Sequence, residues 1–291
     1  MREDNIAFCR RKSGGGAVYH DLGNSCYSFL TPIAPDVLPL NARVDNNKVL
    51  VRALESIGIH TELSDRNDIF YNGKKVSGSA YQASLGKKDG SGRKTLHHGT
   101  MLLDADLNSL RKYLNPKKEF LVSKGVDSVK SPVGNLIDAR GDLTHDKFCE
   151  AVIEEYKKSY PGSEYKIEEY IQEDMENIPR VAEIQKELIS WDWQFRKTPE
   201  FSNKLIQAFQ WGTIEISMKV VHGSIVEGKA TVSHGHEELV KRLDEALNSK
   251  EIIYDQYGCL QLCQHLTETL ESTTANGEIV YDLEQWLPMA I

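Results

Sequence analysis

A run of three glycines, Gly14 to Gly16, most restricts what this chain can fold into. It stands within RRKSGGGAVYHDLGN, residues 10–24, between two arginines and an alternating stretch. Glycines let a backbone approach a ligand closely and offer its N–H groups to a phosphate or carboxylate. The segment matches neither the Gly-x-Gly-x-x-Gly pattern nor the GK[ST] phosphate loop, so the usual nucleotide folds are not indicated. Bare glycines are more often a flexible turn, but Arg10 and Arg11 can grip an anion bidentately and favour a ligand site.

A second motif, RNDIFYNGKKVSGSAY, occupies residues 66–81. Asn72-Gly73 is the strongest short hairpin signal, and it places Lys75 just beyond a tight turn. An isolated lysine is nearly always a surface residue. Beside the backbone donors of Ser77-Gly78-Ser79, however, a lysine can stabilise charge that develops on a carboxylate or phosphate during acyl activation. Asn67 and Asp68 form a polar pair that is either a turn or part of the site, with Asp68 as a candidate Mg²⁺ ligand.

Histidines supply a third feature. Neighbouring residues on a strand face opposite ways, so His97 and His98 are poorly placed to share one metal. We expect structural histidines that line a pocket rather than zinc ligands. His20 is expected to orient or pack rather than to act as a general base.

Charge, apolar runs and cysteine content limit the kinds of partner and compartment that suit this chain. The net charge of −8 argues against nucleic acid. Residues 71–98 nevertheless carry six basic residues against one acid, and residues 10–12 are all basic, which suggests a site for a small polyanion unless these are solvated loops. No apolar run reaches the length of a membrane span, and the start lacks the apolar core of a signal peptide. Five scattered cysteines suit a reducing compartment, and Cys259 and Cys263 are expected as buried core thiols.

Hydrophobic periodicity predicts the main elements. A strand and turn are expected over 14–33, including AVYH and SCYSFL, followed by a helix over 44–57 that Gly58 caps and a hairpin over 67–81. Thr144 should cap a helix through Lys158, with an inward stripe of Phe148, Val152, Ile153 and Tyr156. Strands TIEISMKV and SIVEGKATV, joined by a His222-Gly223 turn, precede the helix HEELVKRLDEALN. The stretch 164–178 is ambiguous, and a boundary near residue 180 gives domains 1–180 and 181–291.

RRKSGGGAVYHDLGN, KKVSGSAY, HHGTMLL and SWDWQF…PEFS, in this order, resemble the lipoate–protein ligase A family over essentially the whole chain. The resemblance implies an α/β (α+β) fold of the biotin/lipoate-ligase type with a mixed sheet, and a small α+β C-terminal accessory domain. It implies that lipoate and Mg·ATP form lipoyl-adenylate, which an acceptor lysine then attacks. The implied acceptors are lipoyl domains of 2-oxoacid dehydrogenase complexes and the glycine-cleavage carrier protein. No nucleic acid or membrane partner is expected. The protein is expected to be a monomer.

The resemblance and the motifs described above together give the predicted site residues. Lys75 corresponds to the family's lysine at the reacting carboxylate and phosphate, and it is the predicted catalytic residue. The predicted ATP and adenylate contacts are Arg11, Gly16, Ala17, Val18, Tyr19, Asn67, Asp68 and Lys75, with Asp68 also the Mg²⁺ candidate. The predicted lipoate contacts are Arg10, Ser13, Gly14, Gly15, His20, Lys75, Ser77, Gly78 and His98. The basic residues from Lys74 to Lys94 are expected to steer the acceptor.

Family members carry several strands and a lipoate-binding loop before the glycine segment, whereas this chain starts at a Met that would lie inside a complete member. We therefore expect a truncated gene model or an alternative start, with cytoplasmic location in a bacterium or mitochondrial location in a eukaryote. Two alternatives stay open: a lipoyltransferase that accepts preformed lipoyl-adenylate, and an inactive binding fragment. A cysteine-dependent octanoyltransferase is disfavoured, because none of the five cysteines sits beside the SGGG or KVSG motif.

Overall fold

The chain forms two compact units, each with its own core. A computed structural model describes residues 4–34, 38–84, 92–115, 120–123, 131–162 and 164–291. The first unit comprises Met1–Ile6, Arg11–Pro116 and Val126–Ile171, and the second comprises Ala7–Arg10, Lys117–Gly125 and Gln172–Ile291. The last of these divisions follows Ile171, and the boundary near residue 180 stays a prediction.

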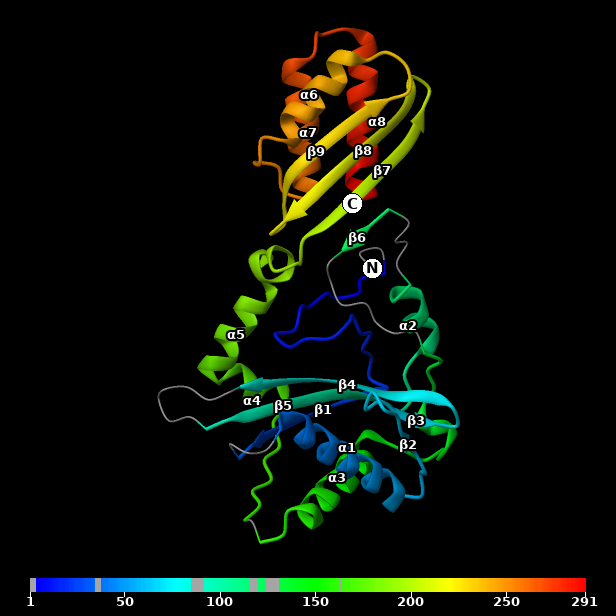
Figure 1. The fold of residues 1–291 in the computed structure, drawn as a ribbon, viewed down its shortest axis with the longest axis vertical. Helices are drawn as coiled ribbons and strands as arrows, with labels where there is room; N and C mark the ends of the chain where they lie inside the picture. The colour runs from blue at the N-terminus through cyan, green and yellow to red at the C-terminus, as the bar shows by residue number, and fades with distance from the viewer. Residues whose placement is uncertain (1–3, 35–37, 85–91, 116–119, 124–130, 163) are drawn as a thin grey trace. The chain divides into compact units, whose positions relative to one another are not determined.

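A five-stranded sheet forms the frame of the first unit (Figure 1). Its strand order is β1-β5-β4-β3-β2, and its named strands pair antiparallel. A bridge between Lys75 and Val133 adds a parallel pairing. The α+β class predicted from the sequence is confirmed. The strands are β1 (Asn24–Pro32), β2 (Glu62–Leu63), β3 (Ile69–Tyr71), β4 (Lys74–Ser84) and β5 (Lys94–Leu102).

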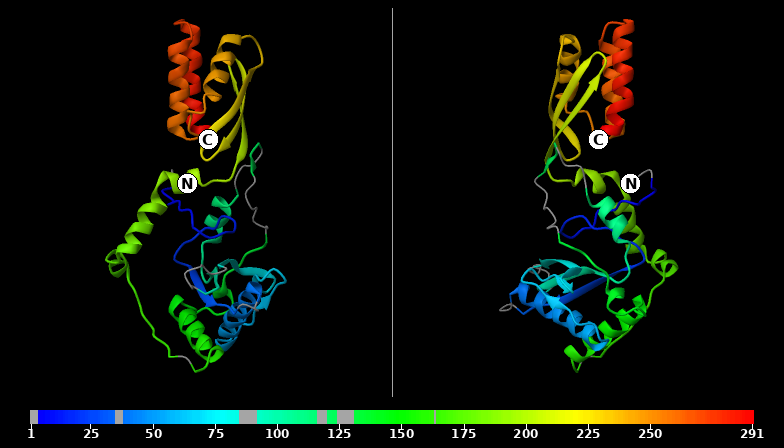
Figure 2. Two further views of the ribbon diagram at one scale, coloured as in Figure 1. Left: turned by 60° about the vertical axis from the view of Figure 1, so that its left-hand side comes forward. Right: turned by 90° about the vertical axis from the view of Figure 1, so that its right-hand side faces the viewer.

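Helices α1 (Pro39–Ser56) and α3 (His145–Ser159) cover one face of this sheet (Figure 1, Figure 2). Helix α1 begins earlier than the apolar spacing predicts, because Pro39 occupies its first turn, where a missing N–H costs nothing. It ends at Ser56, and Gly58, two residues later, has a φ of 81° that permits the left-handed cap. Leu50 and Leu54 of α1 pack with Tyr27 and other inward strand residues in one core. The opposite face of the sheet is therefore free to form a site.

Helix α3 confirms its predicted cap and corrects its predicted stripe. The Thr144 hydroxyl accepts a hydrogen bond from the Lys147 N–H at 3.3 Å. Phe148 is buried and Val152 packs against the core, but Ile153 and Tyr156 are exposed, so their predicted burial is wrong. The inward face of α3 instead runs through Phe148, Ala151 and Glu155. Glu155 can lie there because its carboxylate accepts a hydrogen bond from Arg52 Nε at 2.5 Å.

Of two segments predicted in the first unit, the structure confirms the hairpin over 67–81 and contradicts the strand over 17–20. The β3–β4 hairpin is confirmed, with φ of 48° at Asn72 and 71° at Gly73, as a type I′ turn requires. The strand predicted at 17–20 is wrong, because the chain there is irregular and β1 begins at Asn24. The carbonyls of Gly14 and Gly16, just before it, accept hydrogen bonds from the Arg11 guanidinium. A side chain thus supplies hydrogen bonds that a sheet would otherwise provide.

A four-stranded antiparallel sheet and three helices on one of its faces build the second unit (Figure 1, Figure 2). The predicted alternation is confirmed, since Ile214, Ile216, Met218 and Val220 all point into the core. The His222-Gly223 turn is present, with φ of 51° and 75°. The elements are β6 (Val122–Ser123), β7 (Phe201–Phe209), β8 (Gly212–Val221), β9 (Ser224–Val232), α6 (Glu237–Leu247), α7 (Gln256–Thr269) and α8 (Thr274–Ala290).

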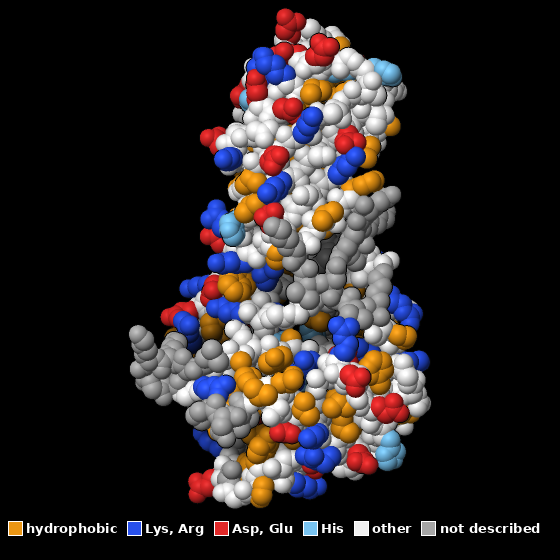
Figure 3. Space-filling view, in the orientation of Figure 1, with side chains coloured by type: hydrophobic (Ala, Val, Ile, Leu, Met, Phe, Trp, Pro, Cys, Tyr) orange, Lys and Arg blue, Asp and Glu red, His pale blue; other side chains and the backbone are white. Residues whose placement is uncertain are grey.

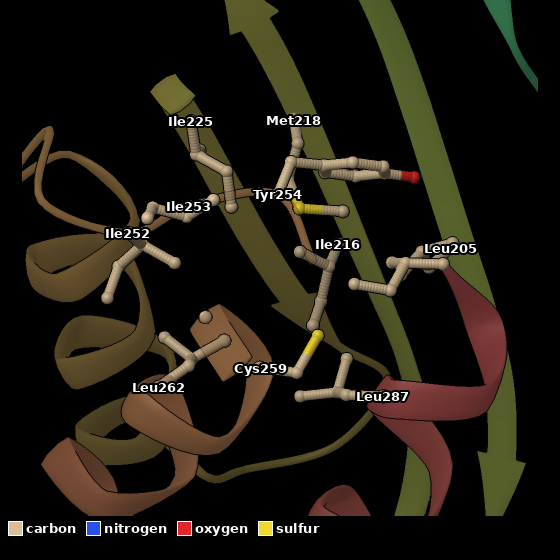
Figure 4. Close-up of a pocket in the computed structure, with 12 residues that line it drawn as sticks. Leu205, Ile216, Met218, Ile225, Ile252, Ile253, Tyr254, Cys259, Leu262 and Leu287 are labelled. Atoms are coloured by element: carbon tan, nitrogen blue, oxygen red, sulfur yellow. The ribbon is translucent and has the colours of Figure 1, made fainter. Parts of the chain in front are cut away.

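The core of the second unit also buries Cys259 and Cys263, as predicted. A small apolar cavity of about 10 Å³ lies among Ile216, Met218 and Cys259 (Figure 4). A space of that size holds at most about one water, and its lining offers that water no polar partners. It is a packing gap rather than a ligand site.

Short elements complete the fold. They are α2 (Leu107–Tyr113), the 3₁₀ turn η1 (Leu136–Asp138), α4 (Gln172–Glu176), α5 (Pro179–Ile189) and the π-helical turn η2 (Asp192–Arg196). The ambiguous stretch 164–178 thus contains a short helix, α4. Across the described ranges, we find no helix with the length and apolarity to cross a membrane.

Candidate active site

The first unit contains a cavity of about 570 Å³ on the sheet face opposite α1 and α3. That volume suits a small organic ligand. Its walls come from five parts of the chain: the glycine segment, β1, β4, β5 and helix α2, with Ser131 and Val133 at one side.

Alternation along the strands builds the floor. Cys26 of β1, Gly78 of β4 and Thr100 of β5 lie in one row across the sheet and all face the cavity. Their neighbours on the other face, such as Tyr27, are buried in the core. Gly99 allows this close packing, since a Cβ there would lie 2.3 Å from the Tyr27 hydroxyl oxygen.

Lys75 is held by both its backbone and its side chain. Its N–H donates to the Pro132 carbonyl at 2.8 Å, and its own carbonyl accepts from the Gly134 N–H at 3.1 Å. Its Nζ lies 2.8 Å from Asp68 Oδ2 and 3.1 Å from the place a Cβ on Gly78 would occupy. The absence of a side chain at Gly78 therefore leaves room for the ammonium group in the cavity wall.

The glycine segment is shaped around Arg11. The Arg11 guanidinium donates to the Gly14 carbonyl at 2.8 and 3.1 Å and to the Gly16 carbonyl at 2.8 Å. Gly15, between them, has φ of 101°, a left-handed conformation that L side chains rarely adopt. A Cβ on Gly15 would also lie 2.7 Å from Arg11 Nη2. Glycine at this position is thus needed for both the backbone angle and the fit of the arginine.

The charges of the cavity are of one sign. Among the described residues that line it, the ionic side chains are Arg11 and Lys75, and there is no carboxylate. Burial and the charge of Arg11 lower the pKa of His20 and of His98, so both rings stay neutral at pH 7. By contrast, side chains of both signs are interspersed on the face of the second unit that Figure 3 shows. The lining itself carries two cations and no acid, with Asp68 paired to Lys75 just off it, and this excess of positive charge on the lining favours an anionic ligand.

Comparison with known proteins decides the family. The sequence profile described as "Lipoyl protein ligase A/B catalytic domain" matches residues 1–157. The curated "Lipoate-protein ligase A" of Psychrobacter cryohalolentis is 32% identical over 291 residues, which cover 99% of this chain and 81% of that protein. The chain belongs to the lipoate–protein ligase A family.

Solved structures of lipoate–protein ligases share the fold. LipL1 of P. falciparum, in complex with lipoate, is 28% identical, with a TM-score of 0.52 over 99% of this chain and 78% of that chain. A lipoate-protein ligase A bound with ATP is 23% identical, with a TM-score of 0.50 over 67% of this chain and 74% of that chain. The second likeness supports the fold alone.

Most of the predicted site residues lie together around the cavity. The lining includes Arg11, Gly15, Gly16, Ala17, Val18, Tyr19, His20, Lys75, Ser77, Gly78 and His98. Ser13 and Gly14 belong to the same segment but lie off the lining, as do Asn67 and Asp68. Asp68 still reaches the site through its ion pair with Lys75. Asn67 forms a turn, with φ of 61° and its carbonyl accepting from Asn47 Nδ2 at 3.2 Å.

Arg10, predicted to contact lipoate, has its side chain in the second unit. Its Nε donates to the Gln194 carbonyl at 2.8 Å, and its Nη2 donates to the Thr198 hydroxyl at 2.7 Å. Its carbonyl accepts from Trp193 Nε1 at 2.7 Å. These contacts fix Arg10 on the π-helical turn η2. Lys87 and Lys88, predicted to steer the acceptor, lie outside the described residues.

Several cavity residues carry no sequence motif that singles them out. They include Cys26, Ser28, Leu110, Leu114, Ser131 and Val133. No cysteine was expected beside the SGGG or KVSG motif, yet Cys26 lines the same cavity as Gly15 and Gly78. Its Sγ also lies 3.8 Å from His20 Nδ1. The alternation of SCYSFL could have revealed this, since Tyr27 and Phe29 face the core and leave Cys26 on the opposite face.

The site shows no preformed all-protein metal centre. Within the described parts of the chain, no three histidine, cysteine or acidic residues group so as to hold a metal ion. His97 and His98 face opposite sides of β5, as predicted. His98 lines the cavity, but the prediction that His97 also lines a pocket is wrong, because its ring is buried in the core. The cationic side chains that the described structure places on the cavity lining are Arg11 and Lys75.

Proposed function

We propose that this lipoate–protein ligase joins lipoate to the AMP portion of ATP in the cavity of the first unit and transfers the lipoyl group to a lysine of a lipoyl domain. The observation that carries the proposal is that Arg11 and Lys75 are the ionic side chains among the described residues of the cavity lining. Carboxylate and phosphates are all anionic, so two cations without a lining acid fit both substrates.

The chemistry requires an activated acyl group, because a carboxylate does not acylate an amine at neutral pH. In the proposed first step a lipoate carboxylate oxygen attacks the α-phosphorus of ATP, and pyrophosphate leaves. In the second step the acceptor amine attacks the carbonyl of lipoyl-adenylate, and AMP leaves. Lys75, fixed by its backbone and by Asp68, is placed to stabilise the charge that develops on the reacting oxygens.

Magnesium is proposed as the companion of ATP. A Mg²⁺ ion in such sites takes one or two carboxylates and completes its shell with phosphate oxygens and water. Asp68, next to Lys75, is the carboxylate that fits this role. The ion supplies neutralisation of phosphate charge when bound, while Lys75 and Arg11 orient the anions.

The proposed acceptors are the lipoyl domains of 2-oxoacid dehydrogenase complexes and the glycine-cleavage carrier protein. Family membership supports these acceptors. The lysine of such a domain would supply the amine that the proposed second step acylates.

Separate assays of the two half-reactions test the proposal. One measures lipoate-dependent release of pyrophosphate from ATP, and the other measures lipoyl transfer from preformed lipoyl-adenylate to a purified apo lipoyl domain. We expect both activities. Transfer without pyrophosphate release would make the chain a lipoyltransferase, and absence of both would contradict the proposal.

A further inference from the structure

The cavity contains a thiol beside an imidazole. Cys26 projects from β1 into the cavity, and its Sγ lies 3.8 Å from His20 Nδ1. Asn24 Nδ2 lies 2.7 Å from the same ring nitrogen and 3.6 Å from the sulfur. An amide N–H donates, so Nδ1 is the unprotonated nitrogen of the neutral ring, and it is the nitrogen nearer the thiol. The cluster joins a nucleophile and a proton acceptor inside a ligand-sized space.

The other cysteines are differently placed. Burial raises the pKa of Cys259 and of Cys263 to about 12, and it raises the pKa of Cys149. Cys9 is exposed but belongs to the second unit. Cys26 is the cysteine on the lining of this cavity. It therefore has access to whatever the cavity binds, while Cys9 offers a matched exposed control.

Strand register sets the separation between Cys26 and the cationic end of the cavity. Cys26 and Gly78 both pair with Thr100, so they lie two strand spacings apart, about 10 Å, on one face. Lys75 Nζ lies 3.1 Å from the Cβ position of Gly78. An extended five-carbon chain spans on the order of 6–8 Å at ordinary bond lengths. A ligand with its carboxylate at Lys75 and such a chain therefore brings its far end to the thiol. In lipoate that far end is a 1,2-dithiolane ring.

We propose that Cys26 captures lipoate by thiol–disulfide exchange with the dithiolane ring, with His20 as the base. This inference rests on the proposed function, since it takes lipoate as the ligand. The Asn24 amide releases the lone pair of His20 Nδ1, the Cys26 thiol gives its proton to that nitrogen, and the thiolate attacks one ring sulfur. The ring S–S bond breaks, a Cys26–ligand S–S bond forms, and the other ligand sulfur takes the proton from His20. No external oxidant or reductant is consumed.

Ring strain favours this exchange. A disulfide prefers a dihedral angle near 90°, which a five-membered ring cannot reach, and a strained disulfide is more readily opened by a thiolate. The freed ligand thiol stays beside the new bond, so the ring can close again and release the acyl group for transfer. Octanoate, which lacks the ring, cannot form this bond. The exchange thus gives the site a chemical preference for a dithiolane-bearing acid over a plain fatty acid.

The test measures covalent capture separately from binding. The full chain is incubated with lipoate, without ATP or reductant, and quenched with iodoacetamide, which alkylates the freed ligand thiol. We expect one lipoate per chain by non-reducing intact-mass measurement, mapped to Cys26 and removed by reductant. Cys9→Ser should retain the adduct, Cys26→Ser should lose it, and octanoate should give none. Calorimetric titration with both acids should show a lipoate preference over octanoate that falls roughly tenfold in Cys26→Ser.

The outcomes separate this inference from the function on which it rests. Binding of both acids without an adduct, or an adduct that persists in Cys26→Ser, overturns the capture and leaves ligase function intact. If neither acid binds, both the capture and the proposed ligase function are contradicted. If Cys26→Ser loses its circular-dichroism signal, the mapped site in the wild-type chain decides: an adduct on Cys26 that saturating octanoate prevents supports capture in the cavity, and an adduct elsewhere overturns it.

Discussion

Asp68 Oδ2 lies 2.8 Å from Lys75 Nζ, and this ion pair joins the residue that precedes β3 to the beginning of β4 beside the cavity. The two side chains are only 24% and 19% exposed, so the pair is screened less than a surface salt bridge. Lys75 also carries backbone hydrogen bonds to the segment around Pro132. The geometry assigns Asp68 a positioning role for the lysine, in addition to its proposed place beside a metal ion.

Asp68→Asn should lower the rate of adenylate formation roughly 10- to 100-fold, because the lysine loses a charge-assisted hydrogen bond worth about 1.5–3 kcal/mol. If Asp68 acts through Lys75, the double variant with Lys75→Ala should be no slower than Lys75→Ala alone. A double-mutant cycle on pyrophosphate release measures this coupling. Fully additive losses would show that Asp68 acts independently of the lysine.

Gly15 and Gly14 should respond differently to an added methyl group. Gly15→Ala places a Cβ 2.7 Å from Arg11 Nη2 at a φ of 101°, and Gly15→Val adds further bulk, so both should weaken ligand affinity at least tenfold. Gly14→Ala meets nothing within 4 Å and serves as the matched control. Titration with a lipoyl-adenylate analogue makes the comparison. Equal affinities for all three variants and the wild type would reduce the glycine segment to a simple turn.

Arg10 and Arg11 are neighbours in sequence with separate expected effects. Arg11→Ala removes a cavity cation and the hydrogen bonds that shape the glycine segment, so ligand affinity should fall roughly 10- to 100-fold. Arg10→Ala removes the bonds to Gln194 and Thr198, so it should lower the melting temperature and leave affinity within about twofold. Calorimetry and thermal unfolding of both variants test this. Equal losses of affinity would return Arg10 to the lipoate site.

His97 should make stability depend on pH. Its side chain is fully buried between Tyr27 and Phe29, and neither ring nitrogen has a hydrogen-bond partner among the described residues. Burial lowers its pKa to about 4, whereas in the unfolded chain it titrates near its ordinary 6.5. The unfolded state therefore binds more protons between these values, and stability falls as pH drops from about 6.5 towards 4, by up to about 3 kcal/mol.

His97→Phe should remove that contribution to the pH dependence. The ring stays, while an unsatisfied buried donor that costs about 1–3 kcal/mol disappears, so the variant should be more stable at pH 7 and more so at pH 5. Urea unfolding of the two proteins at both pH values gives the comparison. An unchanged difference in unfolding free energy between pH 7 and pH 5 would contradict the assignment.

Local patterns predict the elements whose causes are local. The Asn72-Gly73 turn, the Thr144 cap and the alternation from Ile214 to Val220 each depend on a few neighbouring residues, and the structure confirms them. The exposed position of Tyr156 escaped prediction because several helix faces carry apolar residues. There the surroundings decided: Tyr156 stacks on Phe29 at 6.3 Å while it remains partly exposed.

The parts of the site that escaped prediction depend on contacts far apart in sequence. Val133 reaches the cavity through its parallel bridge to Lys75, which no periodicity reports. The odd-numbered residues of β1 from Ser25 to Phe29 face the core, so Cys26 faces the cavity, where it neighbours His20. Proximity in sequence was also misleading, since Arg10 and Arg11 read as one basic cluster yet their side chains belong to different units.

Pyrophosphate release by Lys75→Ala and by Lys74→Ala, with lipoate and ATP, tests most directly that the cavity cations perform the chemistry. Lys74 is the exposed neighbour off the cavity lining, so its loss leaves the site unchanged. The account predicts wild-type rates for Lys74→Ala and, for Lys75→Ala, a loss of roughly 100- to 1,000-fold, about 2.7–4 kcal/mol, with an unchanged circular-dichroism spectrum. Equal rates in the two variants would contradict it.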